Sequence, residues 1–412
     1  MSRLDELIEE YCPEGAEYVY FKDTCNYIRG VTYNKSQEIN NNSEDGIKVL
    51  RANNINLSSN TLNFNDIKLI KNEVKVKHEQ YLYKGDILIC AGSGSKEHIG
   101  KVAYIDRDMN LTFGGFMAVI RPITNINDRY LFHILTGYNF KNYLNYSLNS
   151  STINNLNKTI LAKFKFPLPS LPVQEEIVRI LDTFTELTTE LTTELTLRKK
   201  QYEYYRDGLL KFGEEVEYKK IKDVFTRLKG TPITASKMKE IENDEGEIKI
   251  FAGGKTVINA HLEDIPNPNI TEVPAVLVQS RGIIDVVYYD KPFTFKNEMW
   301  AYTHENKTTV KYLYYVLKNN INEFRKKSQG MGSMPQISLT VTEDFIIPLP
   351  SLKIQERIVY VLDYFDKVCN DLNIGLPVEI EARNKQYEYY RDSLLTFAET
   401  GKIIPTDRQT KT

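Results

Sequence analysis

Hydrophobic residues recur at alternating steps of three and four in two long stretches of the chain, residues 167–213 and 348–400. This spacing is typical of an amphipathic helix with one narrow apolar stripe, and prolines before each stretch and acids near its start indicate where the helix begins. The first stripe consists of Ile177, Ile180, Phe184, Leu187, Leu191, Tyr202, Tyr205, Leu209 and Phe212. The second consists of Ile358, Val361, Phe365, Val368, Leu372, Tyr387, Tyr390, Leu394 and Phe397. We therefore predict two long helices that pack their stripes against each other.

Short apolar and β-branched runs separated by turn residues fill much of the remaining chain and predict β-strands. They are IKVLRA, GDILICAG, GKVAYI and FMAVIRP in residues 1–166, and EIKIFAGG, AVLVQSRG, IIDVVYYD and PFTFK in residues 214–347. Each group is followed by a predicted helix, 128–145 and 308–327, and then by a polar loop, 148–158 and 329–339. The pattern predicts the α+β class, with two mixed α/β domains separated by the two long helices.

The two halves of the chain are copies of one another. The first helical stretch opens with PLPSLPVQEEIVRILD and closes with KQYEYYRDGLLKF, and the second opens with PLPSLKIQERIVYVLD and closes with KQYEYYRDSLLTF. Upstream, Glu17-Tyr18 and Gly30 recur as Glu217-Tyr218 and Gly230. A repeat of this length indicates a duplicated unit, so the chain forms a pseudo-two-fold repeat. We divide it into a first domain 1–166, a first helix 167–213, a second domain 214–347, a second helix 348–400 and a C-terminal tail 401–412.

A four-residue unit is copied in tandem inside the first helical stretch, where residues 185–195 read TEL, TTEL, TTEL. Four residues are close to one helical turn, so each unit changes the helix length by ~6 Å and keeps the stripe nearly in phase. The second stretch has instead an interruption at Gly375 and Pro377. The TTEL array is either a length-adjusting spacer or a low-complexity part of a solvent-facing helix.

Composition and charge narrow the choice of function. The chain of 412 residues has no apolar run long enough to cross a membrane and no signal segment at its N-terminus, which predicts a cytoplasmic protein without a membrane partner. Its four cysteines have no CxxC spacing, and we expect free thiols. The formal net charge is −2, but Lys and Arg outnumber Asp and Glu by 19 to 13 in residues 17–166 and by 18 to 17 in residues 217–347. Basic charge concentrated in the domains is a weak indication of a polyanionic partner.

The repeated PLPSL-x-x-QE-x-IV-x-x-LD opening, the repeated KQYEYYRDxLLxF ending and the CPEGAEYVYFKD segment near the N-terminus resemble the specificity subunit of type I restriction-modification enzymes. The resemblance covers essentially the whole chain. It implies that each domain is a target recognition domain reading one half of a split, asymmetric DNA sequence, and that the helices pair as an antiparallel coiled coil that fixes the half-site spacing. The implied partners are double-stranded DNA, two methyltransferase (modification) subunits docked on the helices, and restriction/translocase subunits.

If DNA is the ligand, base reading needs Arg, Lys, Asn, Gln, Ser or Thr side chains on loops. Loop position and matched placement in the two copies select the candidates. In the first domain they are Arg29, Lys35, Arg51, Asn53, Asn54, Ser93, Ser95, Lys96, Lys101, Thr152 and Asn155. In the second domain they are Lys229, Thr231, Lys237, Lys255, Gln279, Ser280, Arg281, Ser333 and Gln336.

Sequence signals for catalysis are weak. Residues 252–256 read AGGKT, but position 249, where a phosphate-binding loop has its first glycine, is Lys249. Asn267-Pro268-Asn269-Ile270 lacks the second proline and the aromatic residue of an amino-methyltransferase motif, and the five histidines have no metal-ligand spacing. We expect neither a metal nor a cofactor on this chain. By the family resemblance, S-adenosylmethionine, ATP and Mg belong to the partners in a DNA adenine-N6 methyltransferase and restriction endonuclease complex. Two other classes stay open, a coiled-coil assembly protein that binds only proteins and a methyltransferase with a disguised site.

Overall fold

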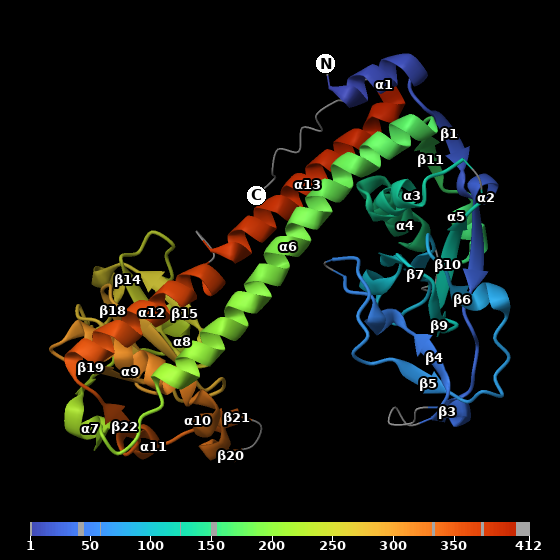
Figure 1. Ribbon diagram of the computed structural model, residues 1–412. Helices are drawn as coiled ribbons and strands as arrows, with labels where there is room; N and C mark the ends of the chain where they lie inside the picture. The colour runs from blue at the N-terminus through green and yellow to red at the C-terminus, as the bar shows by residue number, and fades with distance from the viewer. Residues whose placement is uncertain are drawn as a thin grey trace. The chain divides into compact units, whose positions relative to one another are not determined.

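The chain folds into two units (Figure 1). The computed structural model describes residues 2–39, 45–57, 59–123, 125–149, 155–331, 334–371 and 375–400. The first unit combines Met1–Glu190 with Ile380–Thr412, and the second is Leu191–Glu379. Each unit therefore contains one α+β domain together with parts of the long helices.

The first unit is built on three sheets. A four-stranded sheet has the order β2-β10-β7-β8, a five-stranded sheet has the order β3-β5-β4-β9-β6, and β1 pairs with β11. The strands are β1 Glu17–Tyr20, β2 Cys25–Arg29, β3 Glu38–Ile39, β4 Ile47–Leu50, β5 Lys68–Ile70, β6 Tyr81–Leu82, β7 Ile87–Cys90, β8 Val102–Tyr104, β9 Met109–Phe113, β10 Met117–Pro122 and β11 Lys165–Leu168. The helices are α1 Arg3–Tyr11, α2 Phe21–Thr24, α3 Asp128–Thr136, α4 Tyr138–Asn149 and α5 Lys158–Ala162, with 3-10 turns η1 Lys35–Gln37, η2 Ala52–Asn54, η3 His78–Gln80 and η4 Lys96–His98. Strand β7 is buried at all four positions, as its continuous apolar run requires.

The second unit repeats this frame in a shorter form. Its sheets have the orders β13-β19-β16-β17, β15-β14-β18 and β12-β22, and a small hairpin joins β20 to β21. The strands are β12 Glu217–Lys220, β13 Thr226–Leu228, β14 Ile248–Phe251, β15 Val257–Ala260, β16 Ala275–Gln279, β17 Asp285–Tyr289, β18 Phe293–Phe295, β19 Trp300–Thr303, β20 Gln329–Met331, β21 Met334–Gln336 and β22 Ile346–Leu349. The helices are α7 Ile221–Val224, α8 Ala235–Ile241, α9 Lys307–Asn319, α10 Ile321–Lys327 and α11 Leu339–Glu343, with 3-10 turns η5 Gly253–Lys255 and η6 Leu262–Asp264.

Strand pairing confirms the pseudo-two-fold repeat. Strand β4 pairs with β5 antiparallel and with β9 parallel, and β14 pairs in the same way with β15 and β18. The matched glycines Gly30 and Gly230 fill equivalent tight positions, because a Cβ at either one would lie 2.2 Å from a carbonyl oxygen, that of Gly114 or of Phe295. Only glycine fits where two backbones approach this closely.

The predicted strands are confirmed, since each of the eight predicted runs contains a strand of the structure. The prediction of one helix over 128–145 and one over 308–327 was wrong, because each region forms two helices. The first break falls at Gly137, whose backbone is extended, and the second at Asn320, which caps α9 with its backbone N–H. The predicted polar loop 329–339 was also wrong in part, since it contains the β20–β21 hairpin.

The first long helix is continuous and the second is interrupted, as predicted. Helix α6 runs over Leu171–Leu209, through the whole TTEL array. The second stretch forms α12 Leu352–Asn370 and α13 Leu376–Thr400. Gly375 lies between them, where a Cβ would be 2.6 Å from the carbonyl oxygen of Lys367.

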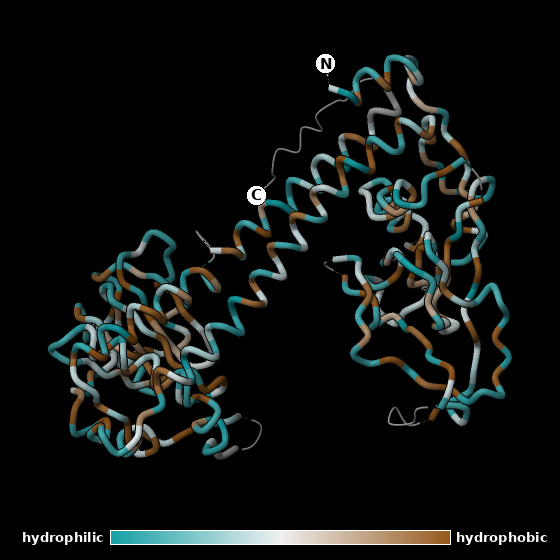
Figure 2. The backbone as a smooth tube through the Cα atoms, in the orientation of Figure 1, coloured by the Kyte–Doolittle hydropathy of each residue, from teal (hydrophilic) through white to brown (hydrophobic). Residues whose placement is uncertain are grey.

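Within each unit, α6 pairs with a helix from the second stretch. In the first unit, Phe184 of α6 stacks on Tyr390 of α13 with ring centroids 5.2 Å apart. In the second unit, Tyr205 of α6 stacks on Phe365 of α12 at 5.6 Å. The partner number falls as the α6 number rises, so the helices pair as an antiparallel coiled coil, and hydrophilic and hydrophobic positions alternate along them (Figure 2).

The most deeply buried helix positions face the domains. Val173, Ile177 and Leu181 of α6 belong to the core of the first unit, and Ile358 and Leu362 of α12 belong to that of the second. Among the other stripe positions, Phe365 and Leu394 are buried, Leu187, Tyr205 and Tyr390 are exposed, and the half-buried ones are Ile180, Phe184, Leu191, Tyr202, Leu209, Val361, Val368 and Tyr387. Leu372 lies outside the described residues. The predicted stripes therefore serve both helix pairing, as at Phe184, and domain packing, as at Ile177 and Ile358.

Candidate nucleic-acid interface

A buried glutamine fixes the start of each long helix to the end of its domain. Gln174 donates to the carbonyl oxygen of Pro169 at 2.7 Å, and Gln355 donates to that of Pro350 at 2.8 Å. Gln174 also accepts from the backbone N–H of Asn127, the residue that caps α3. Both copies of the QE motif therefore act as structural links between domain and helix, a role that the sequence pattern did not reveal.

A carboxylate about two helical turns further along makes a second link. In the first unit, Asp182 accepts hydrogen bonds from Arg129 and from His133, the latter at 2.9 Å. Burial lowers the pKa of His133, so a neutral imidazole donates through Nε2 and accepts at Nδ1 from the hydroxyl of Tyr387, 2.9 Å away. Burial also acts to raise the pKa of Asp182, but the bonds from His133 and Arg129 outweigh it and lower that pKa to about 2. This network ties α3 to both α6 and α13.

The second unit repeats the link with different side chains. Asp363 of α12 accepts from the hydroxyl of Tyr315 and lies 3.4 Å from the ammonium group of Lys311. Tyr315 and Lys311 occupy the places that His133 and Arg129 hold in the first unit. Each LD dipeptide in the repeated opening therefore supplies one buried leucine and one anchoring carboxylate.

With the domains fixed in this way, the loops at one end of each four-stranded sheet form a cluster. In the first unit this cluster, which we call the reading end, joins the loop after β7 to the turn before β10. Asn155 bridges to Gly92, and the N–H of Leu156 donates to the carbonyl oxygen of Ala91 at 2.7 Å. Arg29 at the end of β2 lies beneath this bridge. Its guanidinium donates to Gly115 O at 2.6 Å, Asn155 Oδ1 at 3.1 Å, Leu156 O at 3.3 Å and Tyr27 Oη at 2.9 Å.

The second unit has an equivalent reading end with its own chemistry. Gln336 bridges to Arg281, and the N–H of Ile337 donates to Ser280 O at 2.9 Å. The guanidinium of Arg281 is exposed and donates twice to Gln336 Oε1, at 3.1 and 3.3 Å. The predicted match of Asn155 with Gln336 is thus reproduced in space. Each amide oxygen holds a guanidinium, from β2 in one unit and from the loop after β16 in the other.

Five predicted DNA-contacting side chains are buried in the structure. Lys101 donates to Ile55 O at 3.0 Å, and burial lowers its pKa. Ser280 donates to the backbone oxygen of Glu298. The other three are Asn54, Thr231 and Gln279. Loop position alone does not reveal whether a side chain points outward or braces the loop from inside, which is why the sequence grouped these residues with the exposed ones.

Other predicted residues stay on the surface. Arg51 and Asn53 are held by Asp66 at 2.7 and 2.9 Å. Among the remaining candidates, Lys35 lies on η1, Lys237 on α8, Lys229 after β13, and Ser93 and Ser95 in the loop after β7. Thr152 and Ser333 lie outside the described residues, and so do the side chains of Lys96 and Lys255.

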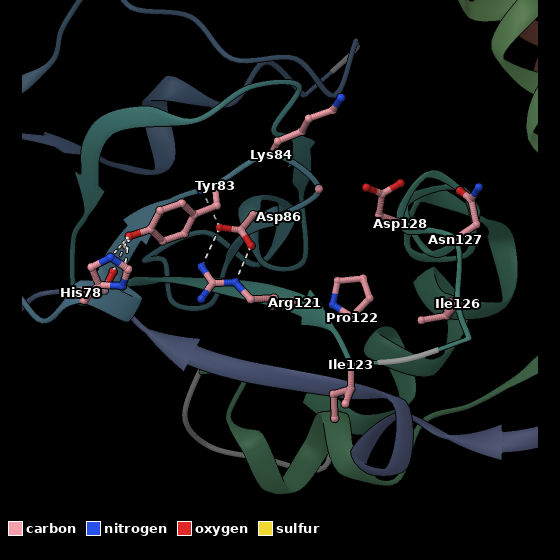
Figure 3. A pocket seen from close by; sticks show the side chains of 11 residues that line it. His78, Tyr83, Lys84, Asp86, Arg121, Pro122, Ile123, Ile126, Asn127 and Asp128 are labelled. Carbon is pink, nitrogen blue, oxygen red and sulfur yellow. Dashed lines mark hydrogen bonds and ion pairs between the residues drawn. The ribbon is translucent and has the colours of Figure 1, made fainter.

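A cavity of about 630 Å³ lies at the opposite end of the first unit's four-stranded sheet (Figure 3). Asp86 and Arg121 form a bidentate ion pair in its wall, with distances of 2.7 and 2.8 Å. The hydrogen bonds that Arg121 donates to Asp86 raise the pKa of Arg121, whose guanidinium also lies over the Tyr83 ring. Because these charges satisfy each other, the pair serves to hold β7 to β10.

Three further observations concern the part of the chain that the structure describes. It contains no cluster of three or more His, Cys, Asp and Glu side chains arranged to hold a metal ion. None of its helices combines the length and apolar character needed to span a membrane. The four cysteines are buried and free, as predicted.

Two copies of one α+β frame, each anchored on paired helices and each ending in a loop cluster of its own composition, define a duplicated recognition protein. The chain belongs to the family described as type I restriction modification DNA specificity domain, whose model matches residues 13–198 and 213–382. Members of this family give type I enzymes their DNA sequence specificity.

Curated relatives agree with this assignment. The specificity subunit of the Escherichia coli type I restriction enzyme EcoR124I/EcoR124II is 37% identical over 257 residues, 57% of this chain and 63% of that protein. The chain thus spans less than two thirds of that relative's length. A putative type I restriction enzyme specificity subunit of Haemophilus influenzae is 31% identical over 354 residues, 79% of this chain and 87% of that protein.

Solved structures share the fold. The type I restriction-modification S subunit from M. genitalium superposes with a TM-score of 0.58 at 16% identity, covering 92% of this chain and 96% of that one. A chain from a structural study of complex assembly and conformational transition of the type I system gives a TM-score of 0.52 at 15% identity, covering 94% of this chain and 98% of that one. At these identities the likeness concerns the fold alone.

Proposed function

We propose that this chain is the non-catalytic, DNA-reading subunit of a type I restriction-modification complex. Each domain reads one half of a bipartite, asymmetric site in double-stranded DNA. The partner subunits carry S-adenosylmethionine, ATP and Mg, methylate adenine at N6 and cleave DNA. The complex works in the cytoplasm.

One observation carries the proposal, namely that the two reading ends share a backbone frame and differ in side chains. The bridges Gly92–Asn155 and Arg281–Gln336 are equivalent, yet the guanidinium at this place comes from Arg29 in one unit and Arg281 in the other. Hydrogen-bonding groups on loops are what major-groove reading requires, and unlike sets of them read unlike half-sites.

The long helices are the proposed docking surface for two methyltransferase subunits. In the second unit three tyrosines are strongly exposed, Tyr204 of α6 at 76% and Tyr360 and Tyr364 of α12 at 76% and 56%. Exposed tyrosines are typical of protein interfaces, because they offer a large apolar surface and a hydrogen-bonding hydroxyl. In the first unit the matched tyrosine of α13, Tyr389, is 41% exposed. The tyrosine position that recurs in both units, Tyr204 and Tyr389, suits two copies of one partner.

The helices are also the proposed spacer that sets the distance between the two half-sites. Along the TTEL array, Leu187 is 40% exposed, and the hydroxyl groups of Thr188 and Thr189 donate to the backbone of their own helix. The array contributes little to either domain core, so its length is free to vary.

The test is co-expression with an adenine methyltransferase subunit of the same system, followed by single-molecule sequencing of the host DNA. We expect N6-methyladenine at one split, non-palindromic motif, and none in cells with either protein alone. Methylation by this chain alone would favour a hidden catalytic site. Absence of any motif, together with no salt-dependent DNA retention by the purified complex, would favour an assembly protein.

A further inference from the structure

The tip of the β9–β10 turn holds an aromatic side chain in solvent. Phe116 follows Gly114 and Gly115, and 73% of its surface is exposed. Its backbone is fixed, because its carbonyl oxygen accepts from the N–H groups of Ala91 and Gly92, both at 2.9 Å. The preceding Gly115 oxygen accepts from Arg29 at 2.6 Å. The ring is therefore presented by a braced turn.

The surroundings of this ring are the polar groups of the first reading end. A Cβ built on Gly92 would lie 3.0 Å from Cδ1 of Phe116, so the glycine leaves room for the ring beside the loop after β7. Asn155 bridges to the same glycine, and Ser93 follows it. An apolar ring thus stands among side chains suited to hydrogen-bonding base edges.

The second unit has a different side chain at the same place. Phe113 and Met117 of the first turn match Phe295 and Met299 of the second, so Phe116 corresponds to Glu298. The Glu298 carboxylate is half-buried, lies 3.0 Å from the Lys296 ammonium group and accepts from the N–H of Gly253 at 3.4 Å. One frame therefore presents a hydrocarbon ring in one unit and a carboxylate in the other.

We propose that Phe116 is a specificity-determining residue for the first half-site and contacts the 5-methyl group of a thymine in the major groove. This inference rests on the proposed DNA-reading function. The thymine methyl group is the apolar group that base pairs display in the major groove, and phenylalanine is among the side chains that contact it. A ring that contacts this methyl group needs to be exposed, to have a fixed backbone and to lie beside hydrogen-bonding side chains. Phe116 meets all three conditions.

The experiment uses the complex of full-length chain and methyltransferase subunits on a duplex that contains the methylated motif. Each thymine of the first half-site is replaced in turn by deoxyuridine, which removes only the methyl group. For the wild-type complex, we expect one replacement to weaken binding about four-fold, the loss for one buried methyl-sized group. Phe116→Ala should bind the unmodified duplex more weakly and show no further loss at that thymine. Phe116→Leu should keep part of the loss of binding that deoxyuridine causes at that thymine.

Matched controls separate this contact from general damage. Deoxyuridine in the second half-site should affect wild type and Phe116→Ala equally, and the exposed position of Phe116 predicts an unchanged melting temperature. Equal responses of both proteins at every first-half thymine would overturn the proposal. So would a first half-site without any A·T pair.

A third result would overturn it in another way. If 2-aminopurine in the first half-site brightens on binding of wild type but not of Phe116→Ala, the ring unstacks bases as a wedge and does not read a methyl group. A wild-type complex that methylates no split motif would instead refute the proposed function, so the two failures are distinguishable.

Discussion

Deleting one TTEL unit, residues 188–191, should shorten the gap between the two DNA half-sites without changing either half-site. The deletion reduces α6 from 39 to 35 residues. At 1.5 Å per residue the helix loses ~6 Å, and at 3.6 residues per turn its two ends rotate by about 40° relative to each other.

The shortening and the rotation give two estimates of the change in the DNA gap between the half-sites. A shortening of ~6 Å corresponds to nearly two base pairs at ~3.4 Å each. A rotation of about 40° is close to one base pair, since B-DNA turns about 35° per base pair at 10–10.5 base pairs per turn. For a spacer helix that lies along the DNA, the expected shift is therefore one or two base pairs.

The deletion should leave both domains folded. The buried helix residues Val173, Ile177 and Leu181 precede the array, and the deleted Leu191 is only half-buried. Its loss costs about 1 kcal/mol, roughly half of the value for a fully buried leucine.

The assay is methylome sequencing of cells that carry the methyltransferase subunit with wild type, the deletion, or an insertion of one further unit. The gap should shorten with the deletion and lengthen with the insertion. The length-matched control, Thr188→Ala with Thr189→Ala, should leave the gap unchanged. Altered half-sites with a constant gap would refute the spacer argument.

Two further outcomes follow from the anchoring network and the reading ends. Asp182→Asn should destabilise the first unit by about 2 kcal/mol at pH 7, the value of a carboxyl pKa lowered from 3.8 to about 2. Because a lowered pKa stabilises the fold above pH ~4 and this contribution is lost as pH falls towards 2, the difference between variant and wild type should shrink over that window in pH-dependent denaturant unfolding. Gln336→Ala should release Arg281 and change the methylated sequence of the second half-site only, and Asn155→Ala should change the first only. Changes in both half-sites from either variant would contradict this assignment.

The sequence predicted those parts of the fold that depend on local pattern. The apolar run ILIC forms β7, and the Gly375 and Pro377 break divides the second helical stretch. The sequence pattern gave wrong predictions where contacts between residues far apart in the chain determine the secondary structure. The helix over 128–145 breaks at Gly137 into α3 and α4, and the β20–β21 hairpin forms in a segment whose polar composition indicates a loop.

The candidate site was predicted by region more successfully than by residue. Matched placement identified Asn155 and Gln336, which do hold equivalent positions. Asn54 satisfied the same loop criterion, yet its amide is buried and donates to backbone oxygens of its own loop. The proposed contact residue Phe116 was not among the candidates, because a search for hydrogen-bonding side chains passes over an apolar one, although its place after two glycines at a turn indicates exposure.

For the proposed function, the anchors allow the half-site gap and the half-site sequences to vary independently. Gln174 and Asp182 fasten the first domain to the N-terminal part of α6, before the array begins at Thr185. Gln355 and Asp363 fasten the second domain to α12 in the same way. Each domain is thus anchored to a helix segment that lies outside the array, so we expect a change in array length to leave the loops of both reading ends unaltered. Conversely, a substitution at Phe116 or Gln336 changes a loop surface without reaching an anchor. If the chain reads DNA as proposed, a duplicated frame with separate anchors lets new half-sites and new gaps arise by separate mutations.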